Sequence, residues 1–183
     1  MSVILDTGPL IVVLQSQCKF PDETAIERHR VHRAKVIHFL DGQTSPFIVP
    51  ALCFTEFLVG LPEEYKEYIF GLPKKFRVAP LTGRVAVIAS RIKMTLMNES
   101  ELEDISKKYG QTKNCISTDL HLLAFCEAEG KKRLLTRDRP LSEKAARLNL
   151  PCTLIDDLPD PPEPIPPKPS ATDPPSLFFG SPQ

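Results

Sequence analysis

Three things are scarce in this 183-residue sequence: long apolar runs, paired cysteines and an excess of charge of one sign. No apolar run approaches the roughly 20 residues that span a bilayer, so a membrane protein is not predicted. The five cysteines are scattered without a CxxC pair, which argues against a zinc site or a disulfide framework and favours small buried thiols. The 23 basic and 23 acidic residues cancel, so no overall positive field points to a polyanionic partner, although a local basic patch is compatible with one.

The amino terminus does not resemble a secretory signal. Its apolar segment from Val3 to Leu14 is interrupted by Asp6, and no basic region precedes it. We therefore expect a cytoplasmic protein. The hydrophobic content of 42% is ordinary for a globular domain.

The composition changes abruptly near Leu158. The segment from Pro159 to Gln183 carries ten of the 19 prolines and few large apolar residues before Leu177. Such a segment cannot form a packed core. We predict one domain over residues 1–157 and a disordered, proline-rich tail over residues 158–183.

Short apolar segments alternate with amphipathic ones before that boundary. The predicted strands are Val3–Leu5, Phe47–Ala51, Phe76–Ala79, Arg133–Thr136 and Thr153–Ile155. The predicted helices include Pro9–Gln15, Ala25–Asp41, Leu52–Val59, Pro62–Phe70, Val85–Met97, Glu99–Lys108, Thr118–Glu129 and Ser142–Leu148. This alternation predicts an α/β fold, with a mostly parallel sheet of about five strands covered by helices on both faces.

Four acids stand out against these predicted elements: Asp6, Glu56, Asp119 and Asp138. In parallel sheets, ligands bind in the crevice beyond the carboxyl ends of the strands, and Asp6 and Asp138 follow two strands directly. Converging carboxylates provide the oxygen ligands that Mg²⁺ and Mn²⁺ prefer. Structural roles are open for three of them, because Asp6 and Asp138 suit turns and Asp119 suits the start of a helix.

Glu56 is harder to explain by such a role. The residues around it are apolar: Leu52, Cys53, Phe54, Phe57, Leu58 and Val59. A carboxylate buried among them is costly unless it is paired or bound to a metal. We therefore expect Glu56 to be buried and to take part in the site.

Four segments in this order resemble the PIN-domain family, the PilT-N-terminus-like nucleases that include VapC-type toxins. The matching segments are Leu5–Ile11, Val49–Ala51 with Thr55–Phe57, Ser117–Ala124 and Leu134–Asp138. The resemblance covers residues 2–156. It departs from the family at Gly8, where many members carry Asn or Ser, and in the long polar stretch from Thr95 to Thr112.

The resemblance implies a PIN-like three-layer sandwich and a ribonuclease that depends on Mg²⁺ or Mn²⁺. Asp6, Glu56, Asp119 and Asp138 match the family's acidic quartet as catalytic and metal-binding residues, and Thr136 matches the hydroxyl residue that supports the last acid. It further implies an RNA substrate, an antitoxin protein as partner if the chain is a toxin, and a homodimer. The resulting prediction is a metal-dependent endoribonuclease.

Two other functions are compatible with the sequence. The first is a catalytically silent PIN fold that binds RNA or acts as a scaffold. The second is a different metal-dependent phosphohydrolase, although Asp6 lacks the second acid two residues on that such enzymes carry.

Basic residues gather in two segments, where a solvated surface is the alternative to contact with RNA phosphates. The first segment is the predicted helix that contains His29, His32 and His38. The second flanks Asp138 and contains Lys131, Lys132, Arg133, Arg137 and Arg139. We expect the second segment to be better placed to meet phosphates.

Overall fold

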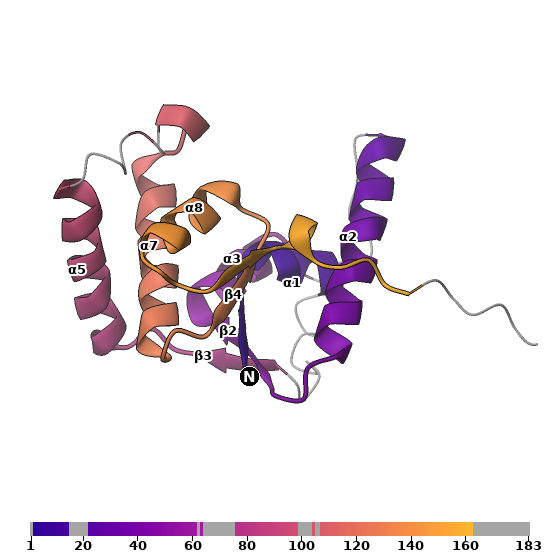
Figure 1. The fold of residues 1–183 in the computed structure, drawn as a ribbon, viewed down its shortest axis with the longest axis horizontal. Coiled ribbons are helices and arrows are strands. Elements are labelled where there is room, and N and C mark those ends of the chain that lie inside the picture. The colour runs from indigo at the N-terminus through magenta and orange to yellow at the C-terminus, as the bar shows by residue number, and fades with distance from the viewer. Residues whose placement is uncertain are drawn as a thin grey trace, which may run out of the picture.

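The computed structural model describes residues 2–14, 22–61, 63, 76–98, 104 and 107–162. Five strands form one parallel sheet in the order β3-β2-β1-β4-β5 (Figure 1). They are β1 (Val3–Leu5), β2 (Phe47–Pro50), β3 (Phe76–Ala79), β4 (Arg133–Thr136) and β5 (Cys152–Leu154). The α/β class and the parallel sheet predicted from the sequence are therefore confirmed.

Seven helices, one of them a 3-10 turn, have bounds within the described residues. They are α1 (Thr7–Leu14), α2 (Glu23–Asp41), α3 (Ala51–Val59), α5 (Gly83–Asn98), α7 (Lys113–Ala128), α8 (Arg139–Arg147) and the 3-10 helix η2 (Ile155–Asp157). The helices α5 and α7 pack together on one side of the sheet, while α2 lies on the other side (Figure 1). The chain is thus arranged in three layers.

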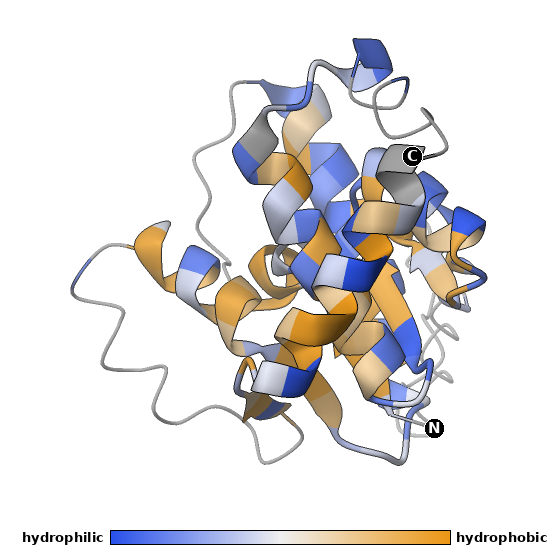
Figure 2. Cartoon of the chain, turned by 90° about the vertical axis from the view of Figure 1, so that its left-hand side faces the viewer, coloured by the Kyte–Doolittle hydropathy of each residue, from blue (hydrophilic) through white to orange (hydrophobic). Residues whose placement is uncertain are grey.

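The hydrophobic core is centred on the sheet. Every residue of β1 and β2 is buried, and Leu134 and Leu135 of β4 are equally inaccessible. Figure 2 shows hydrophobic residues concentrated in this central layer, with hydrophilic residues towards the outside. Strands buried on both faces read as continuous apolar runs, which is why their positions were visible in the sequence.

Several helices begin earlier than the sequence predicted. Thr112, not a residue near Thr118, caps α7 by accepting a hydrogen bond from the Cys115 amide. Asp119 consequently lies well inside this helix and does not open it. In the same way α8 starts directly after Asp138, with Pro140 in its first turn, where a missing N–H costs nothing.

Three predictions concern residues outside the described part. They are the helix over Pro62–Phe70, most of the helix over Glu99–Lys108, and residues 163–183 of the predicted tail. Leu158, the first residue of that tail, is 4% exposed and belongs to the core. The boundary after residue 157 stays a prediction. Within the described ranges, none of the helices has the length and apolar character needed to cross a membrane.

Candidate functional site

The strand order places the site. From β1 the chain winds outward to β2 and β3 on one side, then returns to β4 and β5 on the other. Ligands in such doubly wound sheets bind where this direction reverses, beyond the carboxyl ends of the strands. Here the reversal lies between β1 and β4, which are followed by Asp6 and Asp138.

Thr136 joins these two acids. The Asp6 amide continues the sheet by donating to the Leu135 carbonyl, with an N–O distance of 3.1 Å. The Thr136 hydroxyl, which is fully buried, donates to Asp6 Oδ2 at 2.6 Å. The same hydroxyl oxygen accepts the Asp138 amide at 2.9 Å. One side chain therefore fixes the Asp6 carboxylate against the backbone that carries Asp138.

The environment of Asp6 favours its protonated form. Burial, the dominant cause, raises the pKa of Asp6 to about 6, although hydrogen bonds from Thr136 and the Thr7 amide favour the charged form. The charges of Asp138 and Glu56 add to the increase. Asp6 is thus a carboxyl that takes up or releases a proton close to neutral pH.

Glu56 does not lie where the apolar residues around it suggested. Cys53 and Phe57, four residues apart on α3, face the core, whereas Glu56 is exposed. The prediction of a buried Glu56 is therefore wrong, because flanking apolar residues do not fix which face of a helix a side chain occupies. Glu56 is nevertheless close to Asp6, since its Oε2 accepts a 2.6 Å hydrogen bond from the Thr7 hydroxyl.

Asp119 has a different partner from the other acids. It is 7% exposed, and its Oδ2 lies 2.7 Å from Nζ of Lys144, whose side chain is inaccessible to solvent. Gln111 completes this group: its Oε1 accepts from Lys144 Nζ at 2.6 Å, and its Nε2 donates to Asp119 Oδ2 at 3.2 Å. The Asp119 charge is therefore balanced within the protein.

Asp138 connects the two parts of the site. Its Oδ1 accepts a 3.3 Å hydrogen bond from the Leu141 amide, so Asp138 caps α8, a role that was not predicted for it from the sequence. Burial raises the pKa of Asp138; the bond from Leu141 opposes this, the Asp119 charge adds to it, and the Lys144 charge opposes it. Asp138 thus responds electrostatically to the Asp119–Lys144 pair and, in turn, acts on Asp6.

Sequence reasoning missed Lys144 and Gln111. Lys144 did carry a signal, because Leu141, Lys144, Ala145 and Leu148 follow the i, i+3, i+4, i+7 spacing of a buried helix face. A lysine on such a face needs a buried anionic partner. Gln111 precedes α7 in a polar stretch and carried no comparable signal.

The predicted Mg²⁺ or Mn²⁺ ion can be tested against this geometry. The oxygen donors are of the right chemistry. However, no three Asp, Glu, His or Cys side chains in the described part of the chain are gathered so that they could hold a metal ion. Asp119, moreover, faces an ammonium group. This arrangement does not fit one ion held by all four acids, and the metal requirement stays a prediction.

The basic residues are distributed differently from expectation. Lys131, Lys132 and Arg133 precede or begin β4, so they lie at the amino end of this strand, whereas Asp138 follows its carboxyl end. Lys132 contacts Glu129 there, with 2.9 Å between Nζ and Oε2. His32 on α2 is buried and contacts Asp156, so it does not belong to a solvated face. Of the segment flanking Asp138, only Arg137 and Arg139 lie beside it in the chain.

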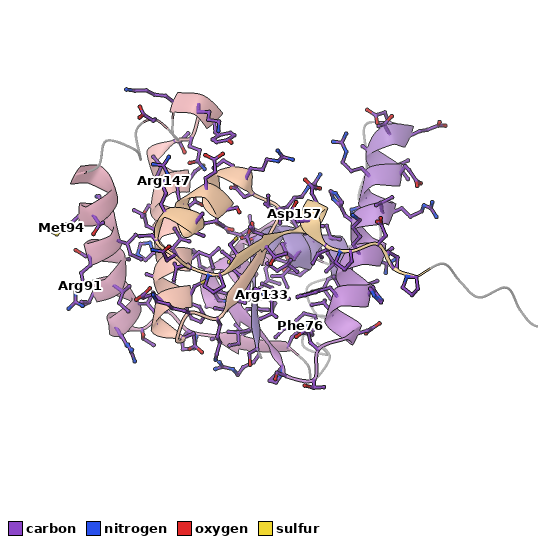
Figure 3. The ribbon with its side chains drawn as sticks, viewed as in Figure 1. Phe76, Arg91, Met94, Arg133, Arg147 and Asp157 are labelled. Atoms are coloured by element: carbon purple, nitrogen blue, oxygen red, sulfur yellow. The ribbon has the colours of Figure 1, made fainter. Side chains whose placement is uncertain are left out.

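A surface groove of about 670 Å³ lies away from the four acids. It runs along α5, and its lining includes Arg84, Val87 and Arg91. Arg91 and Met94 project from the outer side of this helix (Figure 3). None of the four acids lines the groove, so it is separate from the candidate site.

The comparisons with known proteins do not assign a function to the site. No family model matches the sequence, and no curated protein matches it. Among solved structures, the VapBC2 complex from Rickettsia felis bound to a DNA fragment from its promoter is similar, with a TM-score of 0.49 and 13% sequence identity. The alignment covers 84% of this chain and 98% of that chain. A similarity of this degree does not say which reaction this chain performs, because function depends on the site and not on the outline of the fold.

Proposed function

We propose that this chain is an endoribonuclease. Its reaction takes place beyond the carboxyl ends of the sheet strands, beside Asp6, Glu56, Asp119 and Asp138. The observation that supports this most is the link from Asp6 through Thr136 to Asp138. Its first bond joins Thr136 to Asp6, 130 positions away in the chain, at 2.6 Å and at the point where the strand order reverses. Two of the segments that resemble PIN domains meet at that link.

The protonation behaviour of Asp6 suits this role. General bases are most effective when their pKa lies near the working pH. With a pKa of about 6, Asp6 is mainly ionised at neutral pH and accepts a proton from an attacking water. Its oxygens already accept bonds from the Thr7 amide, the Thr136 hydroxyl and, at 3.9 Å, the Cys53 thiol, so of about four acceptor positions on the carboxylate one is left for a water.

The metal, the partner and the oligomer remain predictions in this proposal. Mg²⁺ or Mn²⁺, an antitoxin protein and a homodimer all rest on the resemblance to PIN domains. Hydrolysis of a phosphodiester needs relief of the negative charge that builds on the phosphate, which is the reason to test for a cation.

A second function is favoured by one specific observation. The ammonium of Lys144 already balances Asp119, and the described acids do not form a group of three around a point. A catalytically silent module that binds RNA or acts as a scaffold would have this arrangement. The two functions differ in whether RNA is cut.

The deciding experiment is an RNA cleavage assay. Purified protein is incubated with a structured RNA pool, with and without Mn²⁺ or Mg²⁺, beside Asp6→Asn and Asp138→Asn variants, and the cut sites are mapped. Asp22→Asn is a matched control, because Asp22 caps α2 by accepting a hydrogen bond from the Ala25 amide and Asn caps equally well. We expect cleavage that both site variants lose and the control keeps. RNA binding without cleavage would favour the silent module, and turnover of an aryl phosphate with RNA untouched would favour a different phosphohydrolase.

A further inference from the structure

The group formed by Lys144, Asp119 and Gln111 is a closed arrangement of polar atoms. The Lys144 ammonium donates to both partners, at 2.7 Å to the Asp119 carboxylate and 2.6 Å to the Gln111 carbonyl oxygen. The Gln111 amide donates to the same carboxylate oxygen at 3.2 Å. The three residues come from α8, from α7 and from the segment before α7. The group therefore ties α7 and α8 together and includes one of the four acids, Asp119.

The burial of Lys144 is unusual for a lysine. Its side chain has no solvent exposure, whereas lysines are almost never fully buried unless they are paired. An ammonium removed from water loses its hydration, and a single carboxylate with one amide oxygen must replace it. A neutral side chain on this face of α8 would avoid that cost but would leave Asp119 unbalanced.

The charge of Lys144 reaches beyond Asp119. It also acts on Asp138, where it opposes the effect of the Asp119 charge. The ammonium thus contacts Asp119 directly and acts on Asp138 through its charge. It satisfies the electrostatic need that a divalent ion would otherwise satisfy.

We propose that Lys144 is the resident counter-ion of Asp119, and that a divalent cation reaches Asp119 only if it displaces the Lys144 ammonium. The natural protein then binds divalent cations weakly at Asp119. Removal of the ammonium without removal of the acids creates a stronger cation site. This inference concerns cation binding, so it goes beyond RNA cleavage and is tested separately from it.

The test is Mn²⁺ binding measured by calorimetry on the full chain. Lys144→Met keeps a long apolar stem and removes the charge. We expect it to bind Mn²⁺ at least about tenfold more tightly than the natural protein, a change of about 1.4 kcal/mol. The double variant Lys144→Met with Asp119→Asn should lose this gain. Lys132→Met is the matched control, because Lys132 also pairs with an acid but lies at the amino end of β4. The affinity of this variant for Mn²⁺ should equal that of the natural protein.

A folded Lys144→Met variant with an affinity equal to or below that of the natural protein would overturn the inference. If circular dichroism shows that this variant does not fold, Lys144→Gln decides in its place. That change also removes the ammonium but keeps a polar end that can bond to Asp119 and Gln111. A gain in Mn²⁺ affinity over the natural protein supports the inference, and no gain overturns it.

Failure of the inference and failure of the proposed function give different results. Natural protein that cuts RNA, beside a lysine variant that gains no Mn²⁺ affinity, rejects the counter-ion role alone. Natural protein that leaves RNA intact, beside a lysine variant that gains affinity, rejects the nuclease alone.

Discussion

The hydroxyl of Thr136 donates to Asp6 Oδ2 at 2.6 Å and accepts the amide of Asp138 at 2.9 Å, so one buried side chain holds both acids at the reversal of the sheet. Thr136→Val keeps the shape and removes both hydrogen bonds. We expect the pKa of Asp6 to rise further, because the bond from Thr136 favours its charged form. The protein should lose about 1–3 kcal/mol of stability, since the Asp138 amide loses its acceptor. Carboxyl titration by NMR measures the pKa of Asp6, and urea unfolding measures the stability. Thr136→Ser, which keeps the hydroxyl, should show neither the rise in pKa nor the loss of stability from the missing bonds.

The raised pKa of Asp6 makes stability depend on pH. In the unfolded chain an aspartate titrates near 4, whereas in the fold Asp6 titrates at about 6. Between these values the folded state binds more protons, so the free energy of unfolding falls as pH rises. Ionisation of Asp6 should therefore leave the free energy of unfolding unchanged below pH 4 and lower it by up to about 3 kcal/mol above pH 6.

Urea unfolding between pH 4 and pH 7 measures this dependence. The variant Asp6→Asn cannot ionise and should lose much of the slope, becoming more stable than the natural protein at pH 7. The pKa of Asp138 is raised as well, so some slope of the same sign remains. Equal slopes for both proteins would show that Asp6 is not the group responsible.

Much of the fold was predictable, because strands buried on both faces leave apolar runs that the sequence shows directly. The positions of Asp6 and Asp138 at strand ends followed from the same runs. The face of a helix is harder to predict, as Glu56 shows: its neighbours are apolar, yet it is exposed. The partner of Asp119 was not predictable from local patterns, because Lys144 reaches it from a helix 25 residues away.

Gly8 lies close to Arg137. An added Cβ at Gly8 would lie 3.1 Å from the Arg137 Cβ, well inside ordinary van der Waals contact. Gly8→Ala gains up to about 1 kcal/mol of helix propensity in α1. Overpacking costs about 1–3 kcal/mol, and the atom in the way is next to the backbone and cannot swing aside. We therefore expect a net loss of stability in urea unfolding.

Gly60→Ala is the matched control for Gly8. Gly60 ends α3 with a φ of −77°, and its added Cβ would meet only ordinary contacts of 3.6 Å and more. Its stability should stay within about 0.5 kcal/mol of the natural value. Because Arg137 precedes Asp138, Gly8→Ala should also reduce RNA cleavage, which Gly60→Ala should not. Unchanged stability of Gly8→Ala would mean that the turn between β4 and α8 yields easily.

Asp156 fixes α2 to the carboxyl-terminal part of the described chain. Its Oδ1 lies 2.7 Å from Nε2 of His32, which is 7% exposed. In Asp156→Ala that buried nitrogen loses its partner, which should cost about 1–3 kcal/mol in urea unfolding. Asp160→Ala is the control, because Asp160 contacts Lys35 at 3.2 Å with a side chain that is 81% exposed. Exposed pairs contribute roughly 0–1 kcal/mol, so this variant should remain close to the natural protein. Equal losses from both changes would mean that the contact with His32 adds no more than a surface pair does.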